Sequence, residues 1–284
     1  MAGSLAPATL AALFGLIIGS FLNVVIYRLP REGMSIVRPR SRCPKCGHQL
    51  AWFENLPIVS WLLQGGKCRA CRAPIPVRYP IVEALTAALF FGSFWLLKPE
   101  EPRALGFVRA AVLAALVAVT YIDFDHRIIP DEITIPGMVL APIVCVLLPS
   151  VMIPERLYQP LLFQLEGKER GAALLLSLAG MAAGAGIIWG VGFLGRLVFK
   201  KEAMGLGDVK LMGLIGGLLG PEGVFLAFLI GVVSGAFFGI VYFLVTRDRY
   251  IPFGPFLALG GAALLLCGKE VRHFFWVTYP GWLR

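Results

Sequence analysis

Long apolar runs are the strongest constraint on how this chain can fold. Several exceed the roughly 18 apolar residues that identify a membrane-spanning helix. Hydrophobic residues make up 58% of the 284 residues, and the mean hydropathy is +0.78. Because backbone N–H and C=O groups in lipid must pair within their own segment, these runs are expected to be helices. The sequence therefore predicts an all-α polytopic membrane protein, not a soluble domain with one anchor.

The runs predict about eight transmembrane helices. The first has no basic segment before it and no small-residue cleavage site after it, so it is interpreted as a retained span rather than a signal peptide. The sixth is short and rich in glycine, which permits close helix packing in lipid. The expected spans are 8–27, 80–97, 105–122, 133–152, 171–197, 207–220, 222–245 and 253–268.

Positive charge is concentrated between the first two expected spans. From Arg28 to Arg78 there are ten Lys or Arg residues and two Glu, in a chain whose net charge is +9. Cytoplasmic loops of membrane proteins accumulate positive charge in this way, so this insertion is expected inside and the N-terminus outside. Together with attraction to the anionic lipid membrane, this explains the basic character, and no nucleic-acid partner is expected.

The same insertion contains two Cys-x-x-Cys pairs with 21 residues between them. Two such turns direct four thiolates at one point, which is typical of a structural zinc site in a zinc-ribbon-like module. Disulfides or a redox-active pair are the alternative, and a cytoplasmic location disfavours them. A closed four-thiolate shell leaves no vacancy for His48, and the metal would stabilise a loop too small for its own core. The ligands are Cys43, Cys46, Cys68 and Cys71.

The five Asp residues all lie on the expected cytoplasmic side. Three fall in the segment 123–131 at the end of the third span, and Asp208 follows the glycines that open the sixth. Carboxylates at the junction of a polar loop and an apolar helix are costly and indicate function. Two that share a proton can act as base and acid in peptide hydrolysis. Solvated charges or ion pairs are the simpler alternative, and these arguments do not separate Asp123 from Asp125.

Several motifs follow one another along nearly the whole chain. They are Gly19–Val24 with Arg28–Pro30, the two cysteine pairs, Glu54–Pro57 with Ser60 and Trp61, Arg78–Pro80 with Glu83, Asp123–Asp131, the GxGD of Gly205–Asp208, and Pro252–Pro255. In this order they resemble the bacterial type IV prepilin leader peptidases, which are GxGD intramembrane aspartyl proteases that also process the pseudopilins of type II secretion.

The resemblance implies how the chain is divided and where it works. The first transmembrane helix (1–27) precedes a cytoplasmic four-cysteine insertion (28–79), which the family associates with methyl transfer, and a membrane aspartyl protease domain (80–284). By motif position, the family's catalytic pair corresponds to Asp123 and Asp208. The expected location is the bacterial inner (cytoplasmic) membrane, with several spans and an active site that faces the cytoplasm.

Members of this family typically have two activities. They cleave the leader from a prepilin or pseudopilin and then methylate the new N-terminus with S-adenosylmethionine. The sequence has no glycine-rich nucleotide fingerprint after a strand, so the methyl-donor site is not located by motif. Glu54, Asn55 and Glu83 are candidates for it, and a role in folding is the alternative for each.

Three other functions are compatible with parts of this pattern. An ion-coupled membrane transporter also uses intramembrane carboxylates, but near the middle of its spans. A non-enzymatic assembly protein with a zinc-stabilised docking loop would tolerate loss of either Asp. A protease with a purely structural zinc module would cleave and not methylate. The resemblance favours the peptidase and methyltransferase over all three.

Overall fold

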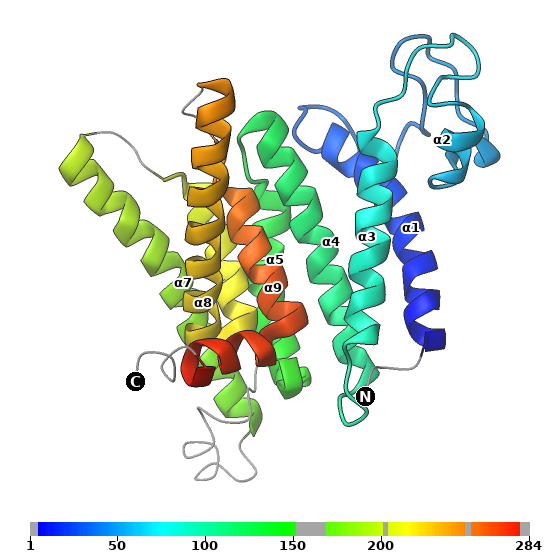
Figure 1. Cartoon of the computed structure of the whole chain (residues 1–284). Helices are drawn as coiled ribbons and strands as arrows, with labels where there is room; N and C mark the ends of the chain where they lie inside the picture. The colour runs from blue at the N-terminus through cyan, green and yellow to red at the C-terminus, as the bar shows by residue number, and fades with distance from the viewer. Residues whose placement is uncertain (1–4, 152–168, 201–203, 248–250, 279–284) are drawn as a thin grey trace. The chain divides into compact units, whose positions relative to one another are not determined.

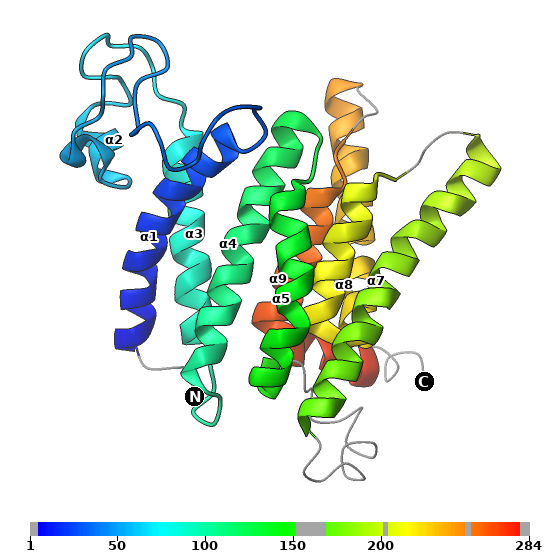
Figure 2. The same cartoon turned by 180° about the vertical axis from the view of Figure 1, so that it is seen from behind.

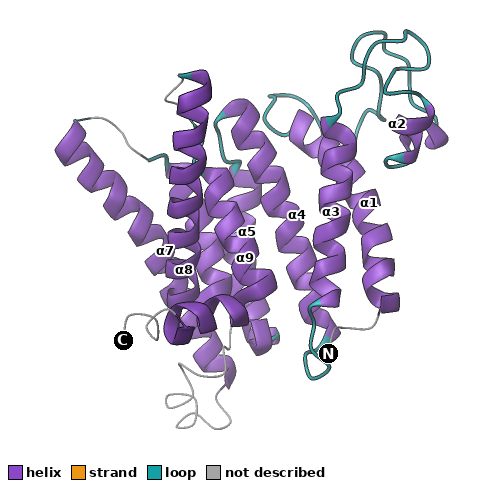
Figure 3. Cartoon of the chain, in the orientation of Figure 1, coloured by secondary structure: helices purple, strands orange, loops and turns teal. Residues whose placement is uncertain are grey.

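The computed structural model describes residues 5–151, 169–200, 204–247 and 251–278, and this part of the chain is helical (Figure 3). No strand occurs within those ranges, and the insertion contributes only two isolated bridges, Arg42 with Gln49 and Lys67 with Pro74. The predicted fold class, an all-α membrane protein with a small four-cysteine insertion, is confirmed. The chain divides into two compact units, Met1–Ile122 and Asp123–Arg284.

The first unit contains the insertion, two complete long helices and most of a third (Figure 1). Its elements are α1 (Leu5–Arg28), η1 (Trp52–Asn55), α2 (Val59–Leu63), α3 (Arg78–Trp95) and α4 (Arg103–His126), whose last residues belong to the second unit. The second unit then contains α5 (Asp131–Leu147), η2 (Pro149–Val151), α7 (Glu169–Phe199), α8 (Leu206–Thr246), α9 (Gly254–His273) and a π-helical turn, η3 (Phe274–Thr278).

A helical segment lies at each predicted span. Among the described residues, five helices are both long and apolar enough to cross a membrane: α1, α4, α7, α8 and α9. The remaining two long helices, α3 and α5, have 18 and 17 residues. The number of spans, eight, stays a prediction, because it depends on α3, on α5 and on how α8 is divided.

Two of the predicted spans, 207–220 and 222–245, join in α8 across a sharp break. Gly220 has φ 73° and ψ 177°, and a proline follows it. A Cβ on Gly216 would lie 3.2 Å from the Val224 side chain, whereas eight residues of a straight helix span about 12 Å. The chain therefore folds back at Gly220, and Figures 1 and 2 show the two halves of α8 side by side.

Glycines allow the helices of each unit to approach closely. In the first unit, a Cβ on Gly15 or Gly19 of α1 would lie 2.8 or 2.7 Å from a Cα atom of α3. In the second, a Cβ on Gly180 of α7 would overlap the carbonyl oxygen of Gly216 in α8, and the reverse also holds. Such contacts replace the hydrophobic driving force that is absent between helices in lipid. They hold in place the helix ends that carry the acidic side chains.

Candidate functional site

Asp123 lies in the last turn of α4 and is 6% exposed. The helix ends at His126, because Arg127 takes φ 58° while its N–H donates to the Asp123 carbonyl at 2.9 Å. The backbone N–H of Gly254, at the start of α9, donates to the Asp123 carboxylate. A Cβ on Gly254 would lie only 2.6 Å from Asp123 Oδ2, so this contact requires glycine.

Asp208 lies in the first turn of α8 and is half-buried. Its Oδ2 accepts a hydrogen bond from the Gly205 N–H at 3.2 Å. Gly207 brings the backbone beside this carboxylate close to Ile129, because a Cβ there would be 2.9 Å from Ile129 Cβ. Each of the two aspartates therefore receives a backbone N–H from a glycine at the start of a helix.

Ile129 connects the surroundings of the two carboxylates. Its side chain lies against Gly207 on one side. On the other side it lies close to Gly254, where an added Cβ would be 3.0 Å from Ile129 Cδ1. Asp123 and Asp208 are close enough for their charges to interact. The structure thus brings together the two segments that the sequence singled out, although 84 positions separate the two aspartates.

The other aspartates of these segments have different surroundings. Asp125 is exposed, unlike the buried Asp123, and this difference favours Asp123 as the partner of Asp208. Both carboxylate oxygens of Asp131 lie 2.7 Å from the Lys210 ammonium, so an ion pair links the starts of α5 and α8. Asp248 lies outside the described residues.

The four cysteines of the insertion form a cluster whose sulfur atoms all lie within 4.8 Å of one another. Two Sγ–Sγ distances, Cys43 to Cys71 and Cys46 to Cys68, are 3.9 and 4.0 Å. A tetrahedral zinc site with Zn–S bonds of about 2.3 Å requires sulfur atoms roughly 3.8 Å apart. The donor set and its spacing therefore fit one zinc ion.

The two halves of the cluster share one backbone design. The Cys43 N–H donates to the His48 carbonyl and the Cys68 N–H to the Ala73 carbonyl, both at 2.8 Å. A residue with positive φ follows each pair, Gly47 at 73° and Arg72 at 58°. The N–H groups of the second cysteine in each pair are the main cause that lowers the pKa of the first thiol, to about 7 for Cys43. Such turns favour the thiolate form of the first cysteine in each pair, which is the form that binds metal.

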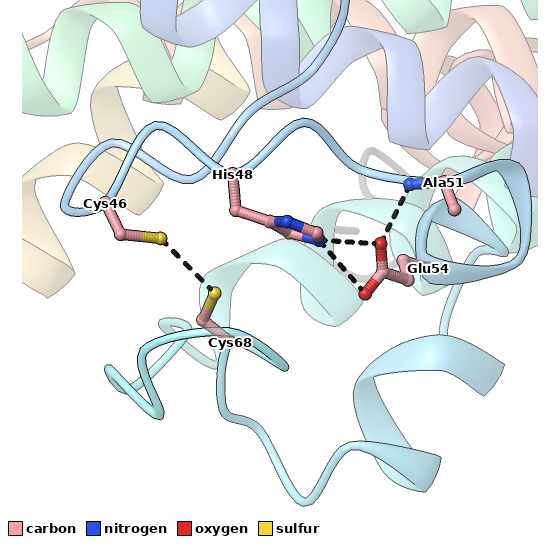
Figure 4. A network of polar contacts seen from close by, with 5 residues as sticks. All are labelled: Cys46, His48, Ala51, Glu54 and Cys68. Atoms are coloured by element: carbon pink, nitrogen blue, oxygen red, sulfur yellow. Dashed lines mark hydrogen bonds and ion pairs between the residues drawn. The ribbon is translucent and has the colours of Figure 1, made fainter.

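Glu54 is buried beside this cluster (Figure 4). Its Oε2 accepts from the Ala51 N–H at 2.8 Å and lies 3.0 Å from His48 Nε2. The Ala51 N–H, and then His48, hold the pKa of the Glu54 carboxyl below its ordinary value. Figure 4 shows the His48 ring directed at Glu54, while its backbone belongs to the first cysteine turn. Sequence reasoning gave His48 no role, and the structure assigns it this link between the cluster and η1.

The other two methyl-donor candidates differ in burial. Glu83 of α3 is 7% exposed, and its Oε2 accepts the Ile58 N–H at 2.7 Å. Ile58 has φ 60°, a strained conformation for a β-branched residue, and this hydrogen bond helps to hold it. Asn55, by contrast, is exposed. The two glutamates thus have structural partners, and Asn55 is the one candidate of the three that is open to a ligand.

Comparison with known proteins gives matches along most of the chain. Residues 13–97 match the Bacterial Peptidase A24 N-terminal domain, and residues 110–240 match the Type IV leader peptidase family. A relative from Aeromonas hydrophila named Prepilin leader peptidase/N-methyltransferase is 35% identical, over 95% of this chain and 94% of its own length. The chain belongs to the type IV leader peptidase family.

Other relatives of this family carry the same name. One from Pseudomonas putida is 34% identical over 93% of this chain and 91% of its own length. One from Myxococcus xanthus is 39% identical over 82% of this chain and 62% of its own length. No solved structure matches the chain.

Each of the two candidate sites lies in a different matched range. The four cysteines lie in the N-terminal domain match, and both Asp123 and Asp208 lie in the Type IV leader peptidase match. Gly254, which contacts Asp123, lies beyond both ranges. The sequence did place it in the Pro252–Pro255 motif, but nothing local to that motif indicated an aspartate as its partner.

Proposed function

We propose that this protein cleaves the leader peptide of type IV prepilins or type II secretion pseudopilins and then methylates the new N-terminus with S-adenosylmethionine. The observation that carries the proposal is the pair Asp123 and Asp208, each held at a helix end. The Ile129 side chain lies beside both, against Gly207 next to Asp208 and against Gly254 next to Asp123. Membership of the type IV leader peptidase family, and the names of the relatives, support both activities.

The pair has the parts that peptide hydrolysis needs. One oxygen of each carboxylate accepts a backbone N–H, from Gly254 or Gly205, which fixes both side chains relative to each other. One aspartate, as carboxylate, takes a proton from water, and the water oxygen attacks the scissile carbonyl carbon. The other, as carboxylic acid, donates its proton to the carbonyl oxygen. Collapse of the tetrahedral intermediate breaks the C–N bond, and the leaving amine takes up a proton.

The protein works in the bacterial inner membrane with this site at the cytoplasmic face. The ten basic residues of the insertion favour a cytoplasmic location for it. If α3 and α4 each cross the membrane once, the end of α4 with Asp123 returns to the same side. A prepilin has a short basic leader before an apolar helix, so its scissile bond lies at that face while the helix remains in lipid.

The insertion would hold zinc through Cys43, Cys46, Cys68 and Cys71. When bound, zinc supplies a closed four-thiolate shell and therefore structure, not a reaction site. It keeps the two cysteine turns together and, through His48 and Glu54, the adjacent η1.

For methyl transfer, S-adenosylmethionine supplies the methyl group. The insertion has to place the pilin amine and exclude water from it. Asn55 is the residue we assign to this task, because it is exposed on η1, whereas Glu54 and Glu83 hold backbone groups.

Mass spectrometry of a prepilin N-terminus, after incubation with the full-length protein and S-adenosylmethionine, tests both activities. We expect loss of the leader and a gain of one methyl group on the new N-terminus. Asp123→Asn should abolish cleavage, while Asp125→Asn, two positions away and exposed, should retain it. Normal cleavage by Asp123→Asn would contradict the dyad, and cleavage without methylation would leave a protease with a structural insertion.

A further inference from the structure

An exposed apolar ridge lies on the insertion, in the segment between the two cysteine turns. Six large side chains within twelve consecutive positions are between 40% and 83% exposed. They belong to η1, α2 and the connection between them: Trp52, Phe53, Leu56, Val59, Leu62 and Leu63. Apolar side chains gathered in this way mark a surface that binds something. We name it the 52–63 ridge.

The ridge lies where the insertion meets the membrane helices. The Ile58 N–H, between η1 and α2, donates to Glu83, which is five residues inside α3. The Cα of Glu83 meets Gly19, nine residues before the end of α1. At 1.5 Å per residue, these positions lie about 7 and 13 Å inside the two helix ends.

That depth places α2 at the level of the membrane surface. α1 carries no charged side chain before its last residue and ends with Tyr27 and Arg28, a pattern that marks the lipid–water interface. Even with the length of the Glu83 side chain added, α2 starts no higher than the ends of α1 and α3. Figures 1 and 2 both show α2 at the height of the start of α3.

The charge around the ridge identifies its partner. The insertion carries ten Lys or Arg and two Glu, which suits the anionic headgroups of the cytoplasmic leaflet. The Arg69 guanidinium lies 5.4 Å from the centre of the Phe53 ring, so a basic side chain borders the apolar surface directly. Aromatic and basic residues together are typical of segments that lie in the interface.

We infer that the 52–63 ridge inserts into the cytoplasmic leaflet beside α1, with its apolar side chains among acyl chains and the nearby basic residues at anionic headgroups. The insertion is then a surface-embedded module and not a free cytoplasmic domain. If the proposed methyltransferase activity holds, this keeps Asn55 at the height where the amine of a cleaved pilin leaves the membrane.

Photo-crosslinking tests the insertion of the ridge directly. The full-length protein, with Leu63→p-benzoylphenylalanine, is irradiated in vesicles of phosphatidylethanolamine and phosphatidylglycerol and analysed by peptide mass spectrometry. We expect lipid adducts at position 63. Lys45→p-benzoylphenylalanine, on an exposed cysteine turn, should give none. Equal zinc content in both variants shows that the insertion is folded.

Two results would overturn the inference. One is the absence of lipid adducts at position 63, or equal adducts at positions 63 and 45. The other is crosslinking of position 63 to a second protein chain, which would make the ridge a protein interface. The adduct forms without catalysis, so failure of the proposed enzyme activity and failure of this inference are separate outcomes.

A charge variant gives an independent measurement. Leu62→Glu with Leu63→Glu should lower methylation in vesicles and leave leader cleavage in detergent unchanged, while Leu62→Met with Leu63→Met should behave like the wild type. Normal methylation by the glutamate variant in vesicles, with zinc retained, would contradict a need for membrane insertion.

Discussion

The two candidate sites of this protein are stabilised in different ways. The aspartates lie at the ends of long helices that pack through glycines such as Gly180 and Gly216, and each receives a backbone N–H. The insertion has two short cysteine turns and a few hydrogen bonds, and its exposed apolar side chains contribute no core. Helix packing in lipid therefore holds the first site, whereas the second depends on the four-cysteine cluster and the zinc ion that we propose it binds. Loss of one should leave the other in place.

The largest expected effect comes from removing one carboxylate. Asp208→Asn eliminates an ionisable group of the pair and should lower the rate of leader cleavage about a hundred- to ten-thousandfold. When the substrate is a pilin without its leader, the same variant should methylate it at the wild-type rate, because the insertion is unchanged. Parallel assays with an uncleaved prepilin and with a pilin that lacks its leader check this. A variant that loses both activities would show that the sites are not independent.

A second variant targets the cysteine cluster of the insertion and leaves the aspartates unchanged. Cys43→Ser with Cys46→Ser should abolish zinc binding, which contributes on the order of 10 kcal/mol to the folding of such small modules. Methylation should be lost and cleavage largely kept. Zinc analysis with both assays measures the effect, and Cys267→Ser, an exposed cysteine outside the cluster, is the thiol control. Loss of cleavage in the double variant would mean that the aspartates need the folded insertion.

A smaller effect is expected from the backbone that supports Asp123. Gly254→Ala puts a Cβ only 2.6 Å from Asp123 Oδ2, which is closer than van der Waals contact allows, so the carboxylate must move. A displacement of about 1 Å at a reacting group can cost about a hundredfold in rate. Gly186→Ala, on exposed α7 surface with nothing within 4 Å, should leave cleavage unchanged. Equal activity of the two variants would remove Gly254 from the site.

Local sequence was enough for the helices and the cluster, but not for the partners of individual side chains. Apolar runs predicted the helical segments, and the spans predicted at 207–220 and 222–245 meet at the break in α8. Cysteine spacing predicted the cluster, because each turn is local. The hydrogen-bond partner of Glu83 could not be predicted from local sequence. That partner, the Ile58 N–H, lies 25 positions away, and only the packing of the insertion against α3 brings them together. Nothing in either motif reveals that contact.

The smallest effect should come from the ion pair between Asp131 and Lys210. It joins α5 and α8 close to the dyad, yet the two side chains are 53% and 34% exposed. Exposed pairs contribute about 0–1 kcal/mol, so Lys210→Met should change cleavage only severalfold. The exchange of both charges, Asp131→Lys with Lys210→Asp, should restore part of the loss.

The salt dependence of that loss distinguishes positioning from chemistry. If the pair only positions the helix ends, raising the ionic strength should weaken wild-type cleavage towards the Lys210→Met level, because salt screens exposed charges. A salt-independent loss as large as that of Asp208→Asn would instead make Lys210 part of the reaction. The dyad would then depend on an exposed charge as well as on glycine packing, and the contrast with the insertion would be weaker than the structure indicates.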